Sequence, residues 1–130
     1  MPAKISSPSP KVPLFINAYL PVLLWATLIF YLSNQAILPG LYVETYDFIF
    51  KKSAHITVYA ILYFLVYRSQ ILVGVTGNKR WQVPFLLVLI YAISDELHQQ
   101  LVPGRFGTLR DVGYDLLGAC LAFLKLYRYI

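Results

Sequence analysis

The stretch LFINAYLPVLLWATLIFYL, residues 14–32, contains no charged side chain over nineteen consecutive positions. A helix rises about 1.5 Å per residue, so this stretch would extend roughly 29 Å, which matches the hydrocarbon core of a bilayer. Lys11 precedes it, as in a signal sequence, but the stretch is long for the apolar part of a signal and no clear small-x-small cleavage motif follows it. We therefore predict an uncleaved first membrane span.

The rest of the chain has the same apolar character. Of its 130 residues, 58% are hydrophobic and 13% are charged, and the mean hydropathy is +0.62. These values lie far from the average of soluble domains and indicate lipid as the solvent. The net charge of +5 comes from basic residues that stand singly or in pairs beside apolar blocks, which argues against a nucleic-acid partner. Cys120 is the only cysteine, so no intrachain disulfide can form.

Three further apolar segments are interpreted as membrane spans, at about residues 53–73, 83–101 and 111–127. Residues 1–13 contain four prolines with serine and lysine, so we expect a disordered tail. Residues 33–50 combine acids with aromatics and fit an interfacial loop or a short surface helix. The small residues Gly118 and Ala122 predict a close helix–helix contact. The predicted fold class is all-α, a bundle of four transmembrane helices within residues 14–130.

Four spans would place both chain termini on the same side of the membrane. Of the eleven basic residues, seven would then lie on the side of the termini and four on the other side. The positive-inside rule therefore favours cytoplasmic termini. Alternating helix direction also brings the start of the second span, the end of the third and the start of the fourth to one surface, which would be extracytoplasmic.

The unusual polar residues of the spans gather at that surface. They include both histidines and four of the six acids of the chain: Lys52, His55, Tyr59, Asp95, Glu96, His98, Gln99, Arg105, Asp111 and Asp115. Spacings of three, four and seven residues place some of them on common helix faces, namely Lys52, His55 and Tyr59 on one, Asp95, His98 and Gln99 on a second, and Asp111 and Asp115 on a third. An ionisable group near the bilayer midplane costs at least about 2.5 kcal/mol, so such a layer indicates either a functional site or pairing between helices.

Several kinds of chemistry are compatible with this polar layer. A histidine oriented by an aspartate could transfer protons, which makes the candidate catalytic residues His98, Asp95, His55 and Asp111. Recognition of an anionic head group or a peptide carboxylate is an alternative. The candidate binding residues are Lys52, Glu96, Gln99, Arg105 and Tyr59. No HExxH or CxxC spacing fixes a set of metal ligands, so we predict neither a metal nor a cofactor.

A combination of motifs over roughly residues 25–125 resembles the VanZ-like family. The motifs are Trp25-Ala-Thr-Leu-Ile-Phe-Tyr-Leu-Ser33, Lys52-x-x-His55-x-x-x-Tyr59, Ser94-Asp95-Glu96-Leu97-His98-Gln99, Pro103-Gly104-Arg105, Asp111 and Gly118. The resemblance implies a small bacterial envelope protein in the plasma membrane, and the namesake of the family is associated with resistance to the glycopeptide teicoplanin. It also implies that the polar residues in these segments are the family's motif positions. Asp115 departs from the asparagine expected there.

From this resemblance we expect an envelope protein whose polar layer binds or modifies a lipid-linked envelope component or an amphiphilic antibiotic. Two alternatives stay open. One is a membrane hydrolase or transferase that uses a His/Asp acid–base pair, so the sequence leaves open whether the protein is an enzyme. The other is a noncatalytic scaffold in which the polar residues only pair helices. The expected partner is the lipid bilayer, and an oligomer could form.

Overall fold

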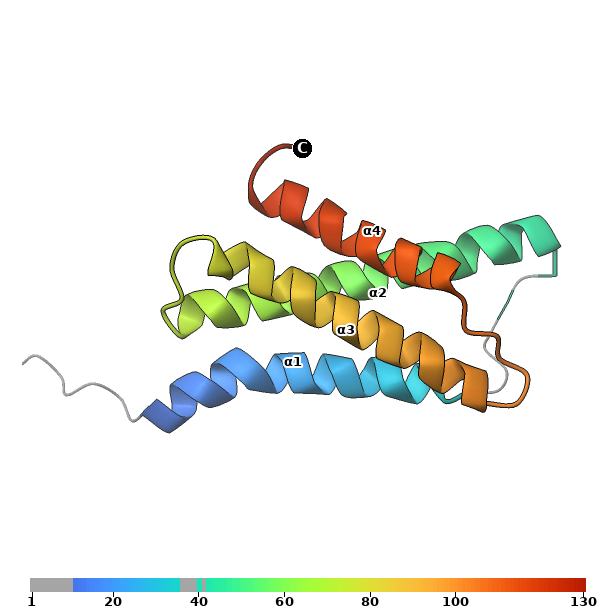
Figure 1. Ribbon diagram of the computed structural model, residues 1–130, viewed down its shortest axis with the longest axis horizontal. Helices are drawn as coiled ribbons and strands as arrows, with labels where there is room; N and C mark the ends of the chain where they lie inside the picture. The colour runs from blue at the N-terminus through green and yellow to red at the C-terminus, as the bar shows by residue number, and fades with distance from the viewer. Residues whose placement is uncertain (1–10, 36–39, 41) are drawn as a thin grey trace, which may run out of the picture.

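The computed structural model describes residues 11–35, 40 and 42–130, and within these residues it contains four α-helices and no strand. The helices are α1 (Lys11–Ser33), α2 (Glu44–Leu72), α3 (Lys79–Leu101) and α4 (Leu109–Leu126). Each helix runs antiparallel to the one before it, so α1 and α3 end where α2 and α4 begin (Figure 1). The all-α prediction is confirmed. Residues 1–10 of the predicted disordered tail lie outside the described residues, whereas residues 11–13 form the start of α1, so the prediction was wrong for these three positions.

The start of α2 differs most from the predicted spans. This helix begins at Glu44, whereas the span was expected at about residue 53, so the second half of the predicted interfacial segment forms its first turns. Glu44 and Asp47 lie in the first turn, where acidic side chains complement the partial positive charge of a helix N-terminus. Residues 36–39 and 41 of that segment lie outside the described residues.

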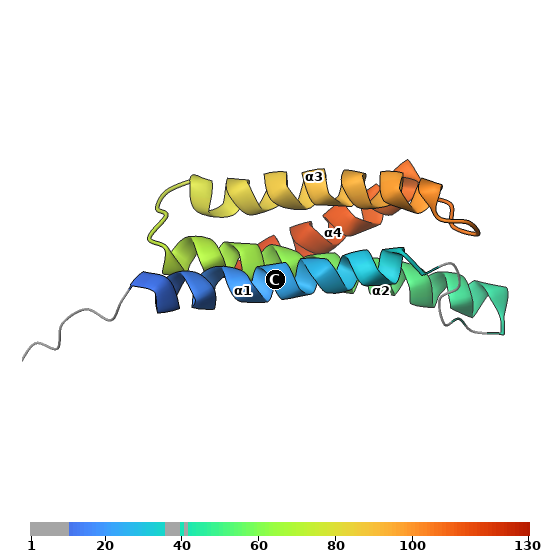
Figure 2. The ribbon, with the colours of Figure 1, turned by 90° about the horizontal axis from the view of Figure 1, so that it is seen from below.

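α2 is the central helix of the bundle. It packs against all three other helices, most extensively against α4, whereas α1 and α4 share no close contact within the described residues. Figure 2 shows α1 and α2 in one layer, with α3 on the opposite side of the bundle and α4 crossing obliquely. Tyr59 and Tyr63 of α2 are buried in the core together with Val88 and Ala92 of α3 and Ala119 of α4.

A glycine sets the distance between α2 and α4. A Cβ atom added to Gly118 would lie 2.1 Å from the carbonyl oxygen of Ile56 and 3.0 Å from the amide nitrogen of Ala60. Both neighbouring atoms belong to the α2 backbone, so they cannot move aside as a flexible side chain would. This contact confirms the helix–helix seam predicted at Gly118.

Two of the helices are long and apolar enough to cross a membrane, Pro13–Ser33 and Glu44–Leu72. α1 leaves much of its apolar surface uncovered, including Leu23 and Leu24. α3 begins with Lys79-Arg80 and carries acidic residues near its other end, and α4 carries charges in both its first and last turns. The arrangement of four spans, and the side on which the termini lie, therefore stay predictions.

Candidate functional site

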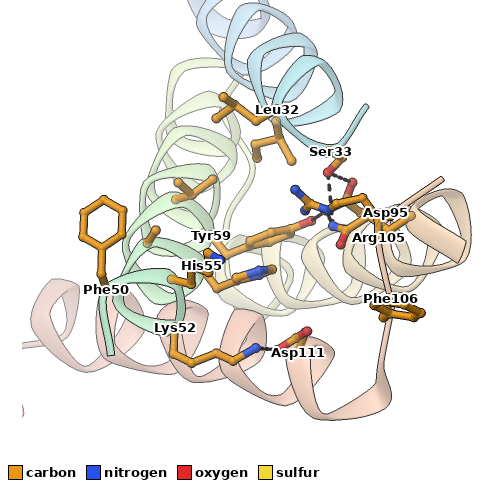
Figure 3. A pocket seen from close by; sticks show the side chains of 16 residues that line it. Leu32, Ser33, Phe50, Lys52, His55, Tyr59, Asp95, Arg105, Phe106 and Asp111 are labelled. Carbon is orange, nitrogen blue, oxygen red and sulfur yellow. Dashed lines mark hydrogen bonds and ion pairs between the residues drawn. The ribbon is translucent and has the colours of Figure 1, made fainter. Parts of the chain in front are cut away.

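A pocket of about 630 Å³ lies at the end of the bundle where α1 and α3 end and α2 and α4 begin. Its lining comes from all four helices and from the loop between α3 and α4 (Figure 3). The apolar part of the lining includes Ile29, Leu32, Phe50, Val58 and Phe106. Seven of the nine candidate residues named from the sequence form most of its polar part, namely Lys52, His55, Tyr59, Asp95, Gln99, Arg105 and Asp111. The pocket is therefore amphipathic.

Asp95 is a buried carboxylate that joins three helices. Its Oδ1 accepts a hydrogen bond from the hydroxyl of Ser33 in α1. Its Oδ2 accepts hydrogen bonds from the hydroxyl of Tyr59 in α2 at 3.0 Å and from Nε2 of Gln99 at 3.3 Å. Both carboxylate oxygens therefore have donors, as a buried charge requires. Ser33 was missing from the sequence-based candidates, although it ends the Trp25 motif of the resemblance and that position was a signal for it.

Lys52 and Asp111 form an ion pair between α2 and α4. The ammonium of Lys52 also lies 5.5 Å from the ring centroids of Phe48 and Tyr114, a distance typical of cation–π contacts. Figure 3 shows this pair on the opposite side of the pocket from Ser33 and Asp95. The charge of Lys52 is thus already balanced by its partner.

His55 is paired with Asp115, a residue absent from the sequence-based candidate list. Nδ1 of His55 lies 2.8 Å from Oδ1 of Asp115, whose side chain is completely buried. The sequence had suggested Asp95 or Asp111 as the orienting carboxylate. The available signal was the spacing of Asp115 four residues after Asp111, which places both on one face of α4. A histidine held by a buried carboxylate can transfer protons.

Glu96 lies behind the pocket and faces the start of α4. It is only 4% exposed, and its Oε2 accepts a hydrogen bond from the backbone N–H of Thr108 at 2.9 Å. A Cβ atom added to Gly107 would lie 1.9 Å from the carbonyl oxygen of Glu96, so the loop packs tightly on α3. The other oxygen, Oε1, has no hydrogen-bond partner within the described part of the chain, and the same is true of Oδ2 of Asp115.

The two remaining candidates differ in what surrounds them. Arg105 lines the pocket and donates a hydrogen bond to the carbonyl oxygen of Gln35 at 3.4 Å, and no carboxylate among the described residues pairs with it. His98 is not part of the pocket lining. Its Nε2 lies 3.3 Å from Oδ1 of Asn34, and its ring packs edge-on against Phe30 with the centroids 4.7 Å apart.

The site therefore offers three chemical resources. Arg105 is a cation available to an anionic ligand, because a guanidinium can bind phosphate or carboxylate through two hydrogen bonds. The His55–Asp115 pair can move a proton. The group His55, Glu96 and Asp115 contains nitrogen and oxygen atoms of the kind that bind divalent metal ions.

The comparisons with known proteins give one match. Residues 15–129 match the family described as VanZ/LLP1, so the match covers the pocket, α2, α3 and α4 completely and nearly all of α1. Neither the curated proteins nor the solved structures contain a match to this chain. The family match agrees with the resemblance seen in the sequence motifs and includes every residue of the polar layer. The chain belongs to the VanZ/LLP1 family.

Proposed function

We propose that this protein spans the bacterial plasma membrane with four helices and that its pocket binds an anionic amphiphile of the cell envelope. The head group of the ligand contacts Arg105, and its apolar part lies against Leu32, Phe50 and Phe106. The observation that carries the proposal is a single pocket that combines this apolar wall with an arginine that has no carboxylate partner among the described residues.

The polar network of the pocket supports an anion as the ligand. Asp95 is satisfied by donors from three residues, and Asp111 is neutralised by Lys52. Neither carboxylate is paired with Arg105, so the guanidinium keeps its charge available for a ligand. Hydrogen bonds to a charged group contribute about 1.5–3 kcal/mol, roughly a 10- to 100-fold change in affinity.

The size and the apolar wall of the pocket support an amphiphile rather than a small ion. Its volume of about 630 Å³ lies inside the range of roughly 300–1,000 Å³ that is usual for ligand pockets. Leu32, Phe50 and Phe106 are exposed apolar side chains. Burying them against an acyl or prenyl chain would remove apolar surface from water, which favours binding.

The membrane setting supports an envelope component as the source of this ligand. The distribution of basic residues along the sequence favours an orientation in which the pocket end of the bundle lies outside the cytoplasm. An anionic amphiphile held there would reduce the access of lipidated glycopeptides such as teicoplanin to their site of action. This resistance role is the part of the proposal that depends on membership of the family.

Lipid-dependent thermal stability of the purified protein in detergent tests the proposal. The probes are a phosphatidylglycerol and a phosphatidylcholine with identical acyl chains. We expect phosphatidylglycerol to raise the melting temperature more, and Arg105→Gln to remove most of this difference. Arg110→Gln is the matched control, because Arg110 is a neighbouring exposed basic residue that does not line the pocket. An equal loss in both variants, or no preference in the wild type, would argue against the proposal.

A membrane hydrolase or transferase is the second candidate function. The His55–Asp115 pair favours it, since His55 lines the pocket and its carboxylate partner is buried. A phosphodiester-containing lipid incubated with the purified protein would then yield product by mass spectrometry, and His55→Gln would abolish the turnover. Product formation that is no faster than without protein would leave ligand binding as the function.

A further inference from the structure

We infer that His55, Glu96 and Asp115 form a binding site for a divalent transition-metal ion such as Zn²⁺ or Mn²⁺. Each residue offers one ligand atom, and these three atoms lie within 4.8 Å of one another. Each residue comes from a different helix, α2, α3 and α4 respectively. Ligand atoms that share one ion at about 2.0–2.2 Å lie roughly 3–4 Å apart, so small side-chain rotations bring the group to bonding distance.

Two buried oxygens point to a missing partner at this site. Oε1 of Glu96 and Oδ2 of Asp115 have no hydrogen-bond partner among the described residues, although Glu96 is 4% exposed and Asp115 is 0% exposed. A buried carboxylate oxygen without a donor is costly, since it has lost its hydration and gained nothing in return. Both oxygens belong to residues of the same three-residue group. One cation between them would satisfy both.

The negative charge of the two carboxylates in the group His55, Glu96 and Asp115 also favours binding of a cation. The group combines two carboxylates with one imidazole, and no lysine or arginine among the described residues forms an ion pair with Glu96 or Asp115. Lys52, the basic residue on the adjacent turn of α2, is paired with Asp111 instead. A divalent ion bound to a neutral imidazole would balance the two carboxylates. The imidazole nitrogen favours Zn²⁺ over Ca²⁺ and Mg²⁺, which prefer all-oxygen sites, and the two carboxylates are ligands that also suit Mn²⁺.

The surrounding contacts hold the ligands in place. The backbone N–H of Thr108 donates to Oε2 of Glu96, and the hydroxyl of Thr108 accepts from the backbone N–H of Asp111 at the start of α4. Gly107 packs directly on the Glu96 backbone. Such outer contacts fix the orientation of metal ligands in known sites. The ion would therefore fasten α2, α3 and α4 to one another at the pocket end.

The site borders the pocket through His55, which belongs to both. Three protein ligands leave at least one coordination position for water or for an oxygen of a bound ligand. If the proposed amphiphile binding is correct, a phosphate of its head group can occupy that position. The metal site itself does not depend on this binding, because Arg105 is not one of its ligands.

Metal stoichiometry measured by inductively coupled plasma mass spectrometry tests the inference. The purified protein is stripped with a chelator, dialysed against Zn²⁺ or Mn²⁺ alone and then desalted. We expect one ion per chain in the wild type and at least tenfold less bound metal per chain in Glu96→Gln and Asp115→Asn. His98→Ala is the matched control, since it removes the only other histidine and should retain the ion. Absence of a stoichiometric ion in the wild type, or loss of the ion in His98→Ala, would overturn the inference.

Thermal stability separates a lost ligand from a failed fold. Glu96→Gln removes one charge from the group and supplies an amide that can donate to the oxygen of Asp115. In chelator, this variant should therefore melt at or above the temperature of the wild type. Added Zn²⁺ should raise the melting temperature of the wild type and leave that of the variant unchanged. Equal stabilisation of both proteins by Zn²⁺ would show that the ion binds elsewhere. Lipid binding can be measured on the same samples, so failure of the metal site and failure of amphiphile binding give different results.

Discussion

The hydroxyl of Ser33 at the end of α1 donates a hydrogen bond to Asp95 of α3, 62 residues later in the chain. The same carboxylate accepts a hydrogen bond from Tyr59 of α2. One buried side chain thus joins three helices at the pocket end of the bundle. A buried carboxylate that loses a hydrogen-bond donor is left partly unsatisfied, so removal of any one donor should lower the free energy of unfolding.

Tyr59→Phe removes one of these donors and little else. We expect a loss of about 1–2 kcal/mol in the free energy of unfolding, because the buried Oδ2 of Asp95 keeps only Gln99 as a donor. Tyr114→Phe is the matched control, since its hydroxyl forms no hydrogen bond with any residue that the structure describes. Unfolding in mixed detergent measures both variants. Equal stabilities of the two variants would show that the hydrogen bond to Asp95 contributes nothing.

Substitution of Lys52 should lower the free energy of unfolding far more than substitution of its neighbour in α2, Lys51. Lys51 pairs with Asp47 at 2.7 Å, just as Lys52 pairs with Asp111. The side chains of Lys52 and Asp111 are 19% and 9% exposed, whereas those of Lys51 and Asp47 are 46% and 22% exposed. Breaking a buried pair typically costs about 3–5 kcal/mol, and breaking an exposed one about 0–1 kcal/mol. Lys52→Met should therefore destabilise the protein far more than Lys51→Met.

A double variant identifies the cause of that loss. Lys52→Met leaves the carboxylate of Asp111 buried and without its cation. Adding Asp111→Leu removes this stranded charge, so the double variant should unfold at higher denaturant than Lys52→Met alone. If the second substitution lowers stability further, the two residues act independently and the pair is not the source of the effect.

Two glycines of α4 provide a matched test of helix packing. Gly118→Ala places a methyl group 2.1 Å from the carbonyl oxygen of Ile56, whereas a Cβ at Gly113 meets nothing within 4 Å. We expect Gly118→Ala to cost about 1–3 kcal/mol through overpacking. Gly113→Ala should gain up to about 1 kcal/mol from better helix propensity. Thermal melting in detergent measures both, and equal behaviour of the two variants would contradict the close contact between α2 and α4.

The sequence predicts the fold class and the polar end of the bundle because both follow from simple periodic features. Apolar blocks of sufficient length identify the helices, and alternating direction brings the polar ends of α2, α3 and α4 together. Gly118 was recognised as a packing residue because the helix spacing of small residues is itself a signal. By contrast, the early start of α2 at Glu44 could not be seen, since the mixture of acids and aromatics before residue 53 also fits a surface loop.

The partners of the histidines could not be predicted, because spacing fixes the face of one helix but not the rotation of that face against its neighbours. His98 and Asp95 are three residues apart and were placed on one stripe. In the structure Asp95 lines the pocket. His98 instead contacts Phe30 in the last turn of α1 and Asn34, the residue that follows α1.

The three-residue group that we propose as a metal site gives no sequence signal for the same reason. It takes one ligand from each of three helices, so no two of its ligands are close in sequence, and only the packing of α2, α3 and α4 brings them together.

Antibiotic susceptibility tests the cellular side of the proposal. In cells that depend on this protein for reduced teicoplanin sensitivity, Arg105→Gln should restore sensitivity while the amount and melting temperature of the protein stay near those of the wild type. Arg110→Gln should keep the protection, because its side chain does not line the pocket. Loss of protection together with loss of folded protein would instead indicate that the polar residues serve chiefly to join helices.

Native mass spectrometry of the detergent-solubilised protein tests the central claim most directly. The protein is equilibrated with an equimolar mixture of phosphatidylglycerol and phosphatidylcholine of equal chain length, and the ratio of the two bound lipids is measured. The proposal predicts a ratio that favours phosphatidylglycerol at least tenfold in the wild type and in Arg110→Gln, and a ratio near one in Arg105→Gln. A ratio near one in the wild type, or a preference that persists in Arg105→Gln, would contradict the assignment of the pocket as a site for an anionic amphiphile.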